Sequence, residues 1–466
     1  MRIFSETRMT QKKPAVKTDA ANFFAENPDI TTVEAFIVDA NGVLRGKWLP
    51  VKGAQKLFEG GLRMARSVYA VDIWGNDVLE AGLVTETGDT DGVCFAVPGS
   101  LKRVPWLETP TAQILLTMQT AEGSPFFGDP RHILERMAAR YKKRGLKAVT
   151  ATELEFYLFS PDQNRQGYPS PPISPRTGRR QDAVQTYSLG EMREFEDVLA
   201  GIRQACELQG VPADTTLSEN GPGQFEVNLV HTDDILDAAD HAVMLKRIVK
   251  GVARRHGLDA TFMAKPYAEE SGNGLHAHVS VLDKKGRNIF AGKTTEGTPA
   301  LRHAIGGLLA ALPGSTAVLA ANVNSYRRFA KGSHAPTKIT WGYDNRSTAI
   351  RVPDSDLNNT RIEHRVAGAD ANPYLVMTVI LGGILAGLDG ETDPGEPVAG
   401  NAYASPAETL PLTWGKAIAR FQRSEFIGNC LGADYRKLYA ACKAQEKTLF
   451  DSMISDVEYN TYLRDI

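Results

Sequence analysis

The sequence predicts an α+β protein with two domains, and three observations support this fold class. Residues 32–38 and 42–49 are β-type segments joined by an Asn-Gly step, which favours a tight hairpin turn. A break rich in proline, glycine and aspartate follows at residues 124–130. Beyond the break, segments with helical spacing flank apolar β-type runs. We therefore expect three regions, namely a flexible tail at 1–18, an N-terminal domain at 19–122 and a second domain at 123–466.

The first elements are short and the second domain opens on a helix. Residues 68–97 are rich in glycine, asparagine and aspartate and predict loops, and residues 113–118 predict one more strand. At the start of the second domain, Asp129 can cap a helix and Pro130 fits its first turn. Gly145 is the expected end of that helix.

The remaining elements follow in order. Residues 148–159 form an apolar β-type run, and residues 168–180 hold four prolines that predict an excursion on the surface. Residues 236–256 have helical spacing. Residues 376–388 are strongly apolar but fall short of the roughly 20 residues that span a bilayer, so we expect a buried helix.

Composition narrows the class of protein. The chain has 466 residues, with 53 lysines and arginines against 55 aspartates and glutamates. The formal net charge of -2 provides no basic field for nucleic acid or for an anionic membrane. The four cysteines lie far apart and form no C-x-x-C pair, and the first 18 residues hold no apolar signal-peptide core. We therefore expect a cytoplasmic protein without nucleic acid or membrane partners.

Two acids in the 148–159 run give the first chemical signal. Residues two apart in a strand point to the same face, so Glu153 and Glu155 stand side by side. Two neighbouring carboxylates repel each other unless a cation lies between them. The structural alternative is an edge strand with a solvated face, but the apolar flanking residues favour a buried sheet.

Three later segments repeat this pattern. Residues 218–229 carry two further glutamates around a Gly-Pro-Gly turn, and residues 274–280 place two histidines and a serine on one strand face. In residues 361–365, two arginines and a glutamate share a face. A lone histidine on a strand is more often a satisfied core residue than a ligand. Four such strands together instead predict an oxygen-rich site that suits Mg²⁺ and tolerates Mn²⁺ through its imidazole. Arginines beside metal ions imply phosphoryl transfer.

These motifs, in this order, resemble the glutamine synthetase family over nearly the whole chain. They are Glu-x-Glu at 153–155, Gly-Pro-Gly-Gln-x-Glu ending at 226, Gly-x-His-x-His-x-Ser at 274–280, Asn-Arg-Ser at 345–347 and Arg-Ile-Glu at 361–363. The resemblance implies an N-terminal β-grasp domain and a C-terminal catalytic funnel of antiparallel sheet flanked by helices. It also implies dodecamers of two hexameric rings, with sites between adjacent subunits.

The resemblance also implies roles for individual residues. One metal ion is expected at Glu155, Glu219 and Glu226, and the other at Glu153, His276 and Glu363. Glutamate is expected at Gly272, Arg328 and Arg365, and ATP at His278, Ser280, Arg351 and Arg361, with Arg346 at the transferred phosphate. The implied chemistry is phosphorylation of the γ-carboxylate of glutamate by ATP, followed by attack of an amine on the acyl phosphate.

The segments in which this sequence departs from the family pattern are those expected to select the amine substrate. Enzymes of the family that use ammonia carry an acid in a Phe-Asp-Gly-Ser-Ser loop and a glutamate on a flap. Here residues 64–77 lack that loop, and the flap has Gly-Ser-His ending at His334. These segments resemble the γ-glutamylpolyamine synthetase branch, so we expect putrescine or another primary alkylamine. We hypothesise that Tyr69, Asp72 and Trp74 line the amine pocket, since an aromatic face and a carboxylate can each hold an ammonium, and that His334 takes the proton.

Several alternatives stay open. The amine can be ammonia at a diverged site, or a small monoamine such as methylamine or ethanolamine. A non-catalytic relative would lack metal ligands, and all six are present. Tyr403 lies near a position that some bacterial members of the family nucleotidylate, but a surface tyrosine in a proline-rich loop is the simpler interpretation.

Overall fold

The computed structural model describes residues 13–162, 167–183, 186–464 and 466. The first helix, α1 (Lys13–Glu26), begins inside the predicted tail, so residues 13–18 are helical and correct that prediction. Residues 1–12 lie outside the described residues. Two separate sheets hold the described strands, and the break predicted at residues 124–130 falls between them.

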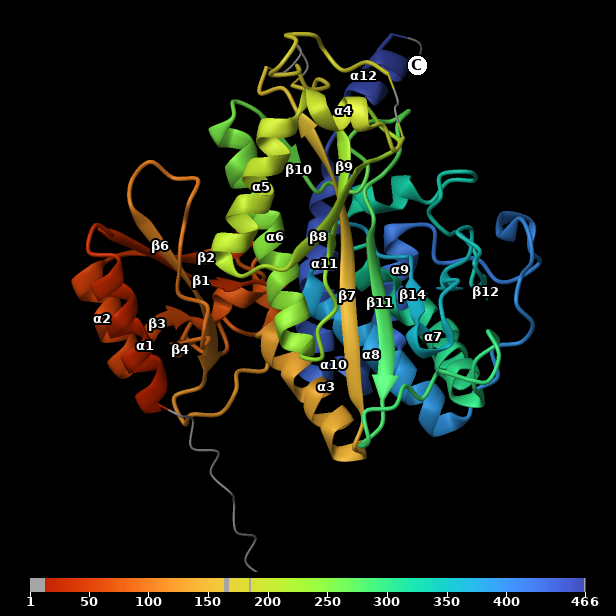
Figure 1. Ribbon diagram of the computed structural model, residues 1–466, viewed down its shortest axis with the longest axis horizontal. Helices are drawn as coiled ribbons and strands as arrows, with labels where there is room; N and C mark the ends of the chain where they lie inside the picture. Colours follow the sequence, from red (N-terminus) through yellow and green to blue (C-terminus); the bar gives the residue numbers. More distant parts are fainter. Residues whose placement is uncertain (1–12, 163–166, 184–185, 465) are drawn as a thin grey trace, which may run out of the picture.

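The first sheet contains six strands in the order β2-β1-β6-β4-β3, with β5 paired to β6. The predicted hairpin is confirmed, because β1 and β2 pair antiparallel from Thr32 opposite Pro50 to Val38 opposite Leu44. Strand β1 also pairs parallel with β6, so the sheet is mixed. Figure 1 shows this sheet and α2 together at one side of the molecule, in red and orange. The strands are β1 (Thr32–Val38), β2 (Leu44–Pro50), β3 (Leu62–Ala65), β4 (Asp91–Ala96), β5 (Lys102–Arg103) and β6 (Thr111–Gln119).

The second sheet contains eight strands in the order β12-β13-β14-β11-β7-β9-β8, with β10 paired to β7. Its long central strand, β7 (Lys147–Phe159), is the predicted apolar run and alternates between more and less buried residues. All of its neighbours in the sheet run antiparallel to it. The other strands are β8 (Ala213–Ser218), β9 (Gln224–Leu229), β10 (Asp259–Thr261), β11 (Leu275–Leu282), β12 (Trp341–Tyr343), β13 (Ile350–Val352) and β14 (Ile362–His364).

The predicted helix caps are present. Asp129 accepts a hydrogen bond from Arg131 N at 2.9 Å, and Gly145 ends the helix α3 in the left-handed region with φ 66°. The helices are α2 (Val51–Gly60), α3 (Pro130–Arg144), α4 (Leu189–Glu194), α5 (Glu196–Gln209), α6 (Ile235–Arg255), α7 (Pro299–Leu319), α8 (Pro373–Gly390), α9 (Trp414–Arg423), α10 (Glu425–Leu431), α11 (Ala433–Ser452) and α12 (Asp456–Tyr462). Short 3₁₀ helices are η1 (Arg66–Ala70), η2 (Leu79–Ala81), η3 (Val323–Arg328), η4 (Leu357–Asn359) and η5 (Ala402–Ala404).

Helix α8 packs closely against α7 in the core. A Cβ atom on Gly307 would lie 2.2 Å from Gly383 O, so only glycine permits this approach of the two backbones. By length and composition α8 could cross a membrane, yet 78% of it is buried inside the protein. The prediction of a buried core helix is therefore confirmed.

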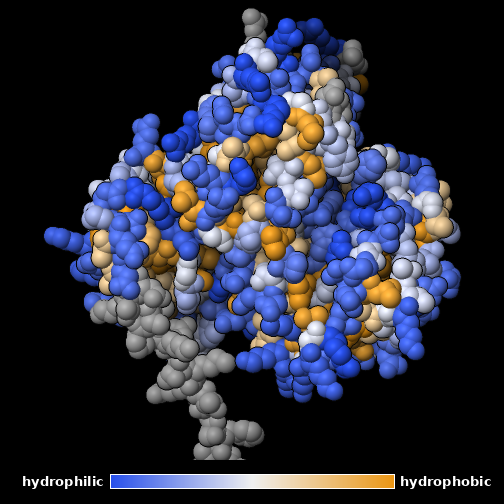
Figure 2. All heavy atoms as spheres, viewed as in Figure 1, coloured by the Kyte–Doolittle hydropathy of each residue, from blue (hydrophilic) through white to orange (hydrophobic). Residues whose placement is uncertain are grey.

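Figure 2 shows a mostly hydrophilic face of the molecule, with apolar side chains scattered over it.

Candidate active site

One cavity of about 550 Å³ gathers most of the predicted site residues. Strands β7, β9, β11 and β14 form its polar wall, and the loops before β9, after η3 and before β13 contribute the rest. Its lining includes all six predicted metal ligands, namely Glu153, Glu155, Glu219, Glu226, His276 and Glu363. It also includes Gly272, Arg328, His334, Arg346, Arg351 and Arg365.

Sheet register explains why the carboxylates meet. On β7, Glu153 lies opposite His276 of β11, and Glu155 lies opposite Glu226 of β9. Strand β7 lies between β11 and β9, and side chains directly opposite each other on paired strands point to the same face of the sheet. The polar residues of the neighbouring strands therefore lie on the face that carries the two glutamates of β7. Glu363 enters from β14, the next strand beyond β11.

Two groups of side chains have ligand atoms close enough to share a cation. One atom each from Glu153, His276 and Glu363 lie within 4.8 Å of one another, and the same holds for Glu155, Glu226 and His276. Carboxylates with one imidazole form a donor set that suits Mg²⁺ or Mn²⁺. The convergence on which the metal prediction depends is therefore present in the fold.

Repulsion between the carboxylates raises the pKa of two glutamates in this cluster. Burial, together with the charges of Glu153 and Glu155, raises the pKa of Glu226 to about 9. Burial and the charge of Glu155 raise the pKa of Glu219 to about 7. Among the described residues, no lysine or arginine forms an ion pair with Glu219 or Glu226, although the charge of Arg365 acts on Glu219. A divalent cation between these carboxylates would supply a positive partner.

Two of the remaining three glutamates, Glu153 and Glu363, have arginine or imidazole partners. Burial alone would raise the pKa of Glu153, but hydrogen bonds from His276 and His278 outweigh burial and hold that pKa well below its ordinary value. His278 Nε2 lies 2.8 Å from Glu153 Oε1. Burial likewise acts on Glu363, and Arg365 overcomes it, lowering the pKa of Glu363 to about 2. Arg351 Nη1 donates to Glu363 Oε2 at 2.7 Å.

Arg328 is placed by the backbone around it. Its side chain is buried, and Nη1 donates to Val366 O at 3.0 Å. A Cβ on Gly272 would lie 2.4 Å from Arg328 Cγ, so glycine leaves the space that this arginine occupies. Guanidinium groups at such positions can meet carboxylate or phosphate oxygens through paired hydrogen bonds.

A family model for the glutamine synthetase catalytic domain matches residues 127–462. The chain belongs to the glutamine synthetase family. It is 40% identical to γ-glutamylputrescine synthetase PuuA of Escherichia coli (strain K12), in an alignment that covers 99% of this chain and 98% of the relative. A glutamate–isopropylamine ligase of Pseudomonas sp. is 32% identical, with 94% and 96% covered. Among solved structures, the GmaS/ADP complex superposes with a TM-score of 0.82 at 30% identity, covering 96% of this chain and 99% of that chain. The predicted family and its α+β catalytic fold are thus confirmed.

The residues expected at the nucleotide of a glutamine synthetase divide into two groups. Arg351 lines the cavity. His278, Ser280 and Arg361 lie outside its lining and contact other groups. Arg361 Nε lies 3.3 Å from His278 Nδ1, and Ser280 Oγ donates to Thr360 O at 3.2 Å. Their nucleotide roles stay predictions.

The three residues predicted to line the amine pocket differ in exposure. Tyr69 and Asp72 are fully buried within the chain, and a neighbouring subunit could only bury them further. Tyr69 Oη donates to Asp129 Oδ2 at 2.8 Å, and Asp72 accepts hydrogen bonds from Trp74 N and Gln445 Nε2. Both residues hold the loop together in this structure, and their role at the amine stays a prediction. Trp74 is 43% exposed and packs on Phe450 with ring centroids 5.0 Å apart, so part of the residue is accessible.

Two residues at the cavity have unusual backbones. His334, predicted from the flap sequence, lines the cavity with φ 59°. Tyr187, which the sequence analysis did not identify, lines it with φ 58°. Positive φ in a non-glycine residue leaves no reliable sequence signal, and Tyr187 follows the proline-rich excursion without a motif of its own.

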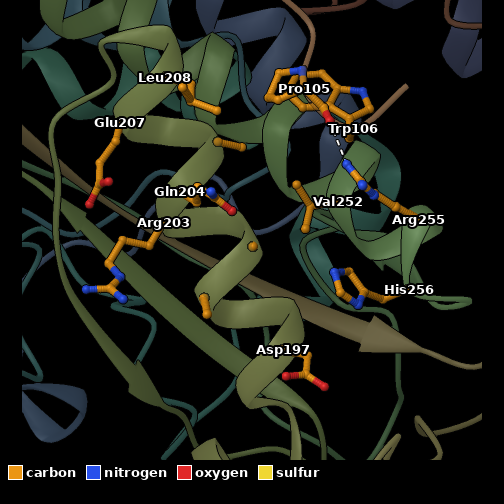
Figure 3. Close-up of a pocket in the computed structure, with 13 residues that line it drawn as sticks. Pro105, Trp106, Asp197, Arg203, Gln204, Glu207, Leu208, Val252, Arg255 and His256 are labelled. Atoms are coloured by element: carbon orange, nitrogen blue, oxygen red, sulfur yellow. Dashed lines mark hydrogen bonds between the residues drawn. The ribbon is translucent and has the colours of Figure 1, made fainter. Parts of the chain in front are cut away.

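A second cavity, of about 670 Å³, lies between α5, α6 and the loop at Trp106. Figure 3 shows Arg255 pointing to Pro105, whose carbonyl it meets at 2.7 Å, and the acids Asp197 and Glu207 lying apart. None of the predicted site residues lines this cavity. Most of the predicted site residues line the carboxylate cavity instead.

Proposed function

We propose that this protein is an ATP-dependent ligase that joins the γ-carboxylate of L-glutamate to a primary amine, with putrescine as the preferred acceptor. The products are the γ-glutamylamine, ADP and phosphate. The observation that carries the proposal is the gathering of five carboxylates, two imidazoles and four arginines in a single cavity. A donor set for divalent cations beside guanidinium groups suits phosphoryl transfer.

We infer that Glu155, Glu219 and Glu226 hold one divalent cation and that Glu153, His276 and Glu363 hold the other. Mg²⁺ is the expected ion, and Mn²⁺ fits the imidazole. Bound there, the cations would neutralise charge on the phosphates of ATP. The raised pKa values of Glu219 and Glu226 support a cation at the first set, because a bound cation would favour the ionised forms.

The protein's own residues then orient the reactants. Arg328 and Arg365, with the backbone at Gly272, would hold glutamate. Its γ-carboxylate oxygen attacks the γ-phosphorus of ATP, ADP leaves, and γ-glutamyl phosphate forms. Arg346, which lines the cavity, would neutralise charge on the transferred group. The amine nitrogen then attacks the acyl carbon and phosphate leaves. The nitrogen loses one proton, and we assign His334 as the group that accepts it.

The choice of amine rests on two arguments. The Phe-Asp-Gly-Ser-Ser loop that carries an acid in ammonia-using members of the family is absent from residues 64–77, and the flap has Gly-Ser-His ending at His334 in place of a glutamate. The relatives named above act on putrescine and isopropylamine, and a γ-glutamylethanolamide synthetase of Streptomyces coelicolor is 31% identical over 97% of this chain. Putrescine leads because its ligase is 40% identical against 31–32% for the monoamine ligases.

The deciding experiment compares acceptors side by side. ADP release is measured with glutamate, ATP and Mg²⁺, using ammonia, methylamine, ethanolamine, isopropylamine, putrescine and spermidine at several concentrations. We expect the highest kcat/KM with putrescine and identify γ-glutamylputrescine by mass spectrometry. A higher kcat/KM with ammonia than with any alkylamine would overturn the substrate proposal and favour a glutamine synthetase.

We further propose the quaternary and domain organisation of the family for this chain. The mixed sheet of β1 to β6 supports a β-grasp domain within residues 19–122, followed by the catalytic domain at 123–466. The partial exposure of Trp74 supports its packing against an adjacent subunit in a dodecamer of two hexameric rings. The enzyme is proposed to act in the cytoplasm. Light scattering at several protein concentrations measures the assembly.

A further inference from the structure

The turn between β8 and β9 separates two of the predicted metal ligands. Glu219 follows the last residue of β8, Glu226 lies in β9, and the Gly-Pro-Gly turn at 221–223 lies between them. The distance between the two carboxylates therefore depends on the shape of this turn. Its last residue, Gly223, is buried and has φ 73°, in the left-handed region.

Three contacts hold Gly223 in place. Its N–H donates to Glu191 Oε1 at 3.2 Å, and its carbonyl accepts a hydrogen bond from Leu158 N at 2.9 Å. A Cβ atom on Gly223 would lie 2.4 Å from Pro172 Cγ, so the ring of Pro172 fills the space that glycine leaves. The proline-rich excursion, to which Pro172 belongs, therefore packs on the turn between the two predicted ligands.

Glu191 reaches this turn from α4. Figure 1 shows α4 at the end of the sheet where β9 begins. Ser188 caps α4 by accepting a hydrogen bond from Glu191 N at 3.2 Å, and Ser218 Oγ donates to Ser188 O at 3.4 Å. Because Ser218 is the last residue of β8, these bonds anchor α4 beside Glu219.

The side chain of Glu191 lies in an unfavourable environment. Glu191 is 3% exposed, and among the described residues no lysine or arginine forms an ion pair with it. Burial raises the pKa of Glu191 to about 7, although the hydrogen bond from Gly223 N opposes this effect. A buried carboxyl group without a cation is costly. The bond to Gly223 accounts for its position, because the buried N–H would otherwise have no partner.

We propose that Glu191 is a positioning residue, which holds the Gly-Pro-Gly turn so that Glu219 and Glu226 face the same cation. The inference rests on the proposed function, specifically on the cation assigned to these two residues and Glu155. Glu191 does not touch the cation. It acts through the backbone of Gly223, which fixes where β9 begins relative to the end of β8.

The other predicted cation site provides an internal comparison. Its ligands, Glu153, His276 and Glu363, come from β7, β11 and β14, and none of them belongs to the turn. Loss of the Glu191 contact should therefore weaken the binding of one cation and leave the other nearly unchanged. A general loss of folding would weaken both.

Titration of the full chain with Mn²⁺, followed by the electron paramagnetic resonance signal of free Mn²⁺, measures both sites without catalysis. In Glu191→Ala we expect the Kd of one of two Mn²⁺ ions to rise about 10-fold, the lower end of the effect of removing groups that orient metal ligands. Glu226→Gln should weaken the same ion, and Glu363→Gln should weaken the other.

Two conservative variants separate the hydrogen bond from the charge. Glu191→Gln keeps an oxygen that can accept from Gly223 N, so it should bind Mn²⁺ like the wild type. Glu191→Asp keeps the charge but is one methylene shorter, so it should lose affinity at the same ion as Glu191→Ala. These two variants also decide the question if Glu191→Ala does not fold. The opposite order of affinities would overturn the inference.

Asp39→Ala is the matched control for stability. Asp39 is buried, accepts hydrogen bonds from Asn41 N and Val43 N, and lies outside the cavity lining. This variant should lower Tm and leave both Mn²⁺ affinities unchanged. Unchanged affinities in Glu191→Ala and Glu191→Asp, or equal losses at both sites, would overturn the inference while the ligase activity stands. A wild-type chain that binds no Mn²⁺ would overturn the metal assignment and this inference together.

Discussion

Lys443 and Glu446 form an ion pair 2.9 Å apart in α11, with side chains 1% and 0% exposed. Lys443 Nζ also donates to Asn41 Oδ1 and lies 3.5 Å from Asn322 Oδ1. Glu446 Oε1 accepts a hydrogen bond from Ile73 N at 2.9 Å. The pair therefore joins the β1–β2 turn and the Trp74 loop to the start of η3. This short helix ends at Arg328, which is predicted to bind the substrate glutamate.

Breaking this pair should destabilise the protein strongly. Lys443→Met leaves the carboxylate of Glu446 buried without its cation, and such a loss costs about 3–5 kcal/mol. Lys443→Met/Glu446→Gln should recover part of the stability, because the neutral amide still accepts from Ile73 N without a buried charge. Urea unfolding of the two variants and the wild type measures the difference. Equal stability of the single variant and the wild type would contradict this account.

Glu153→Gln should remove activity with every acceptor. Glu153 is close to both His276 and His278, so an uncharged amide disturbs a predicted metal ligand and its imidazole neighbours together. Because metal binding precedes any choice of amine, turnover should fall at least about 100-fold with putrescine, ethanolamine and ammonia alike. Initial rates with each acceptor check this, and Glu207→Gln, a change at the cavity of Figure 3, is the control that should stay active. A loss confined to one amine would argue against the metal role.

Particular residues show what the sequence could predict. The spacing of Glu153 and Glu155 predicted a shared strand face, and the order of the motifs predicted that His276 and Glu363 join them. Strand alternation and the family's motif order are sufficient for that prediction. The burial of Tyr69 was not predictable in the same way, because it depends on a contact with Asp129, 60 residues further along the chain. The position of Tyr187 at the cavity was not predicted, because its left-handed backbone depends on tertiary hydrogen bonds that no local sequence pattern encodes.

His334 should affect the proton-transfer step selectively. His334→Asn is preferred to alanine, because asparagine tolerates φ 59° and keeps the flap backbone. With putrescine near pH 7.5 we expect kcat to fall about 100-fold, the lower range for loss of a general base. Hydroxylamine is already uncharged at this pH, so its rate should fall much less, and the putrescine rate should recover as pH rises. Equal losses with both acceptors would assign His334 a structural role.

Stability of the metal-free protein should fall as pH rises. In the folded protein the pKa of Glu226 is about 9 and that of Glu219 about 7, both above the ordinary value of 4.5. Between pH 4.5 and each of these pKa values, the folded state therefore binds more protons than the unfolded state. These two groups therefore favour folding at low pH and lose that contribution as pH rises through 7 and 9. Glu153 and Glu363 have lowered pKa values, so their contribution is lost only as pH falls below about 4.5 and is constant from pH 6 to 8.5.

Mg²⁺ should counteract this loss, because the cation binds the ionised carboxylates and not their protonated forms. The increase in Tm on adding Mg²⁺ should therefore be larger at pH 8.5 than at pH 6. In Glu226→Gln the metal-free Tm should fall less with pH, since one buried charge is gone, and the Mg²⁺ effect should shrink at pH 8.5. Thermal melts at the two pH values, with and without EDTA, measure both effects. A Mg²⁺ effect that is independent of pH in the wild type would show that these carboxylates do not bind the cation.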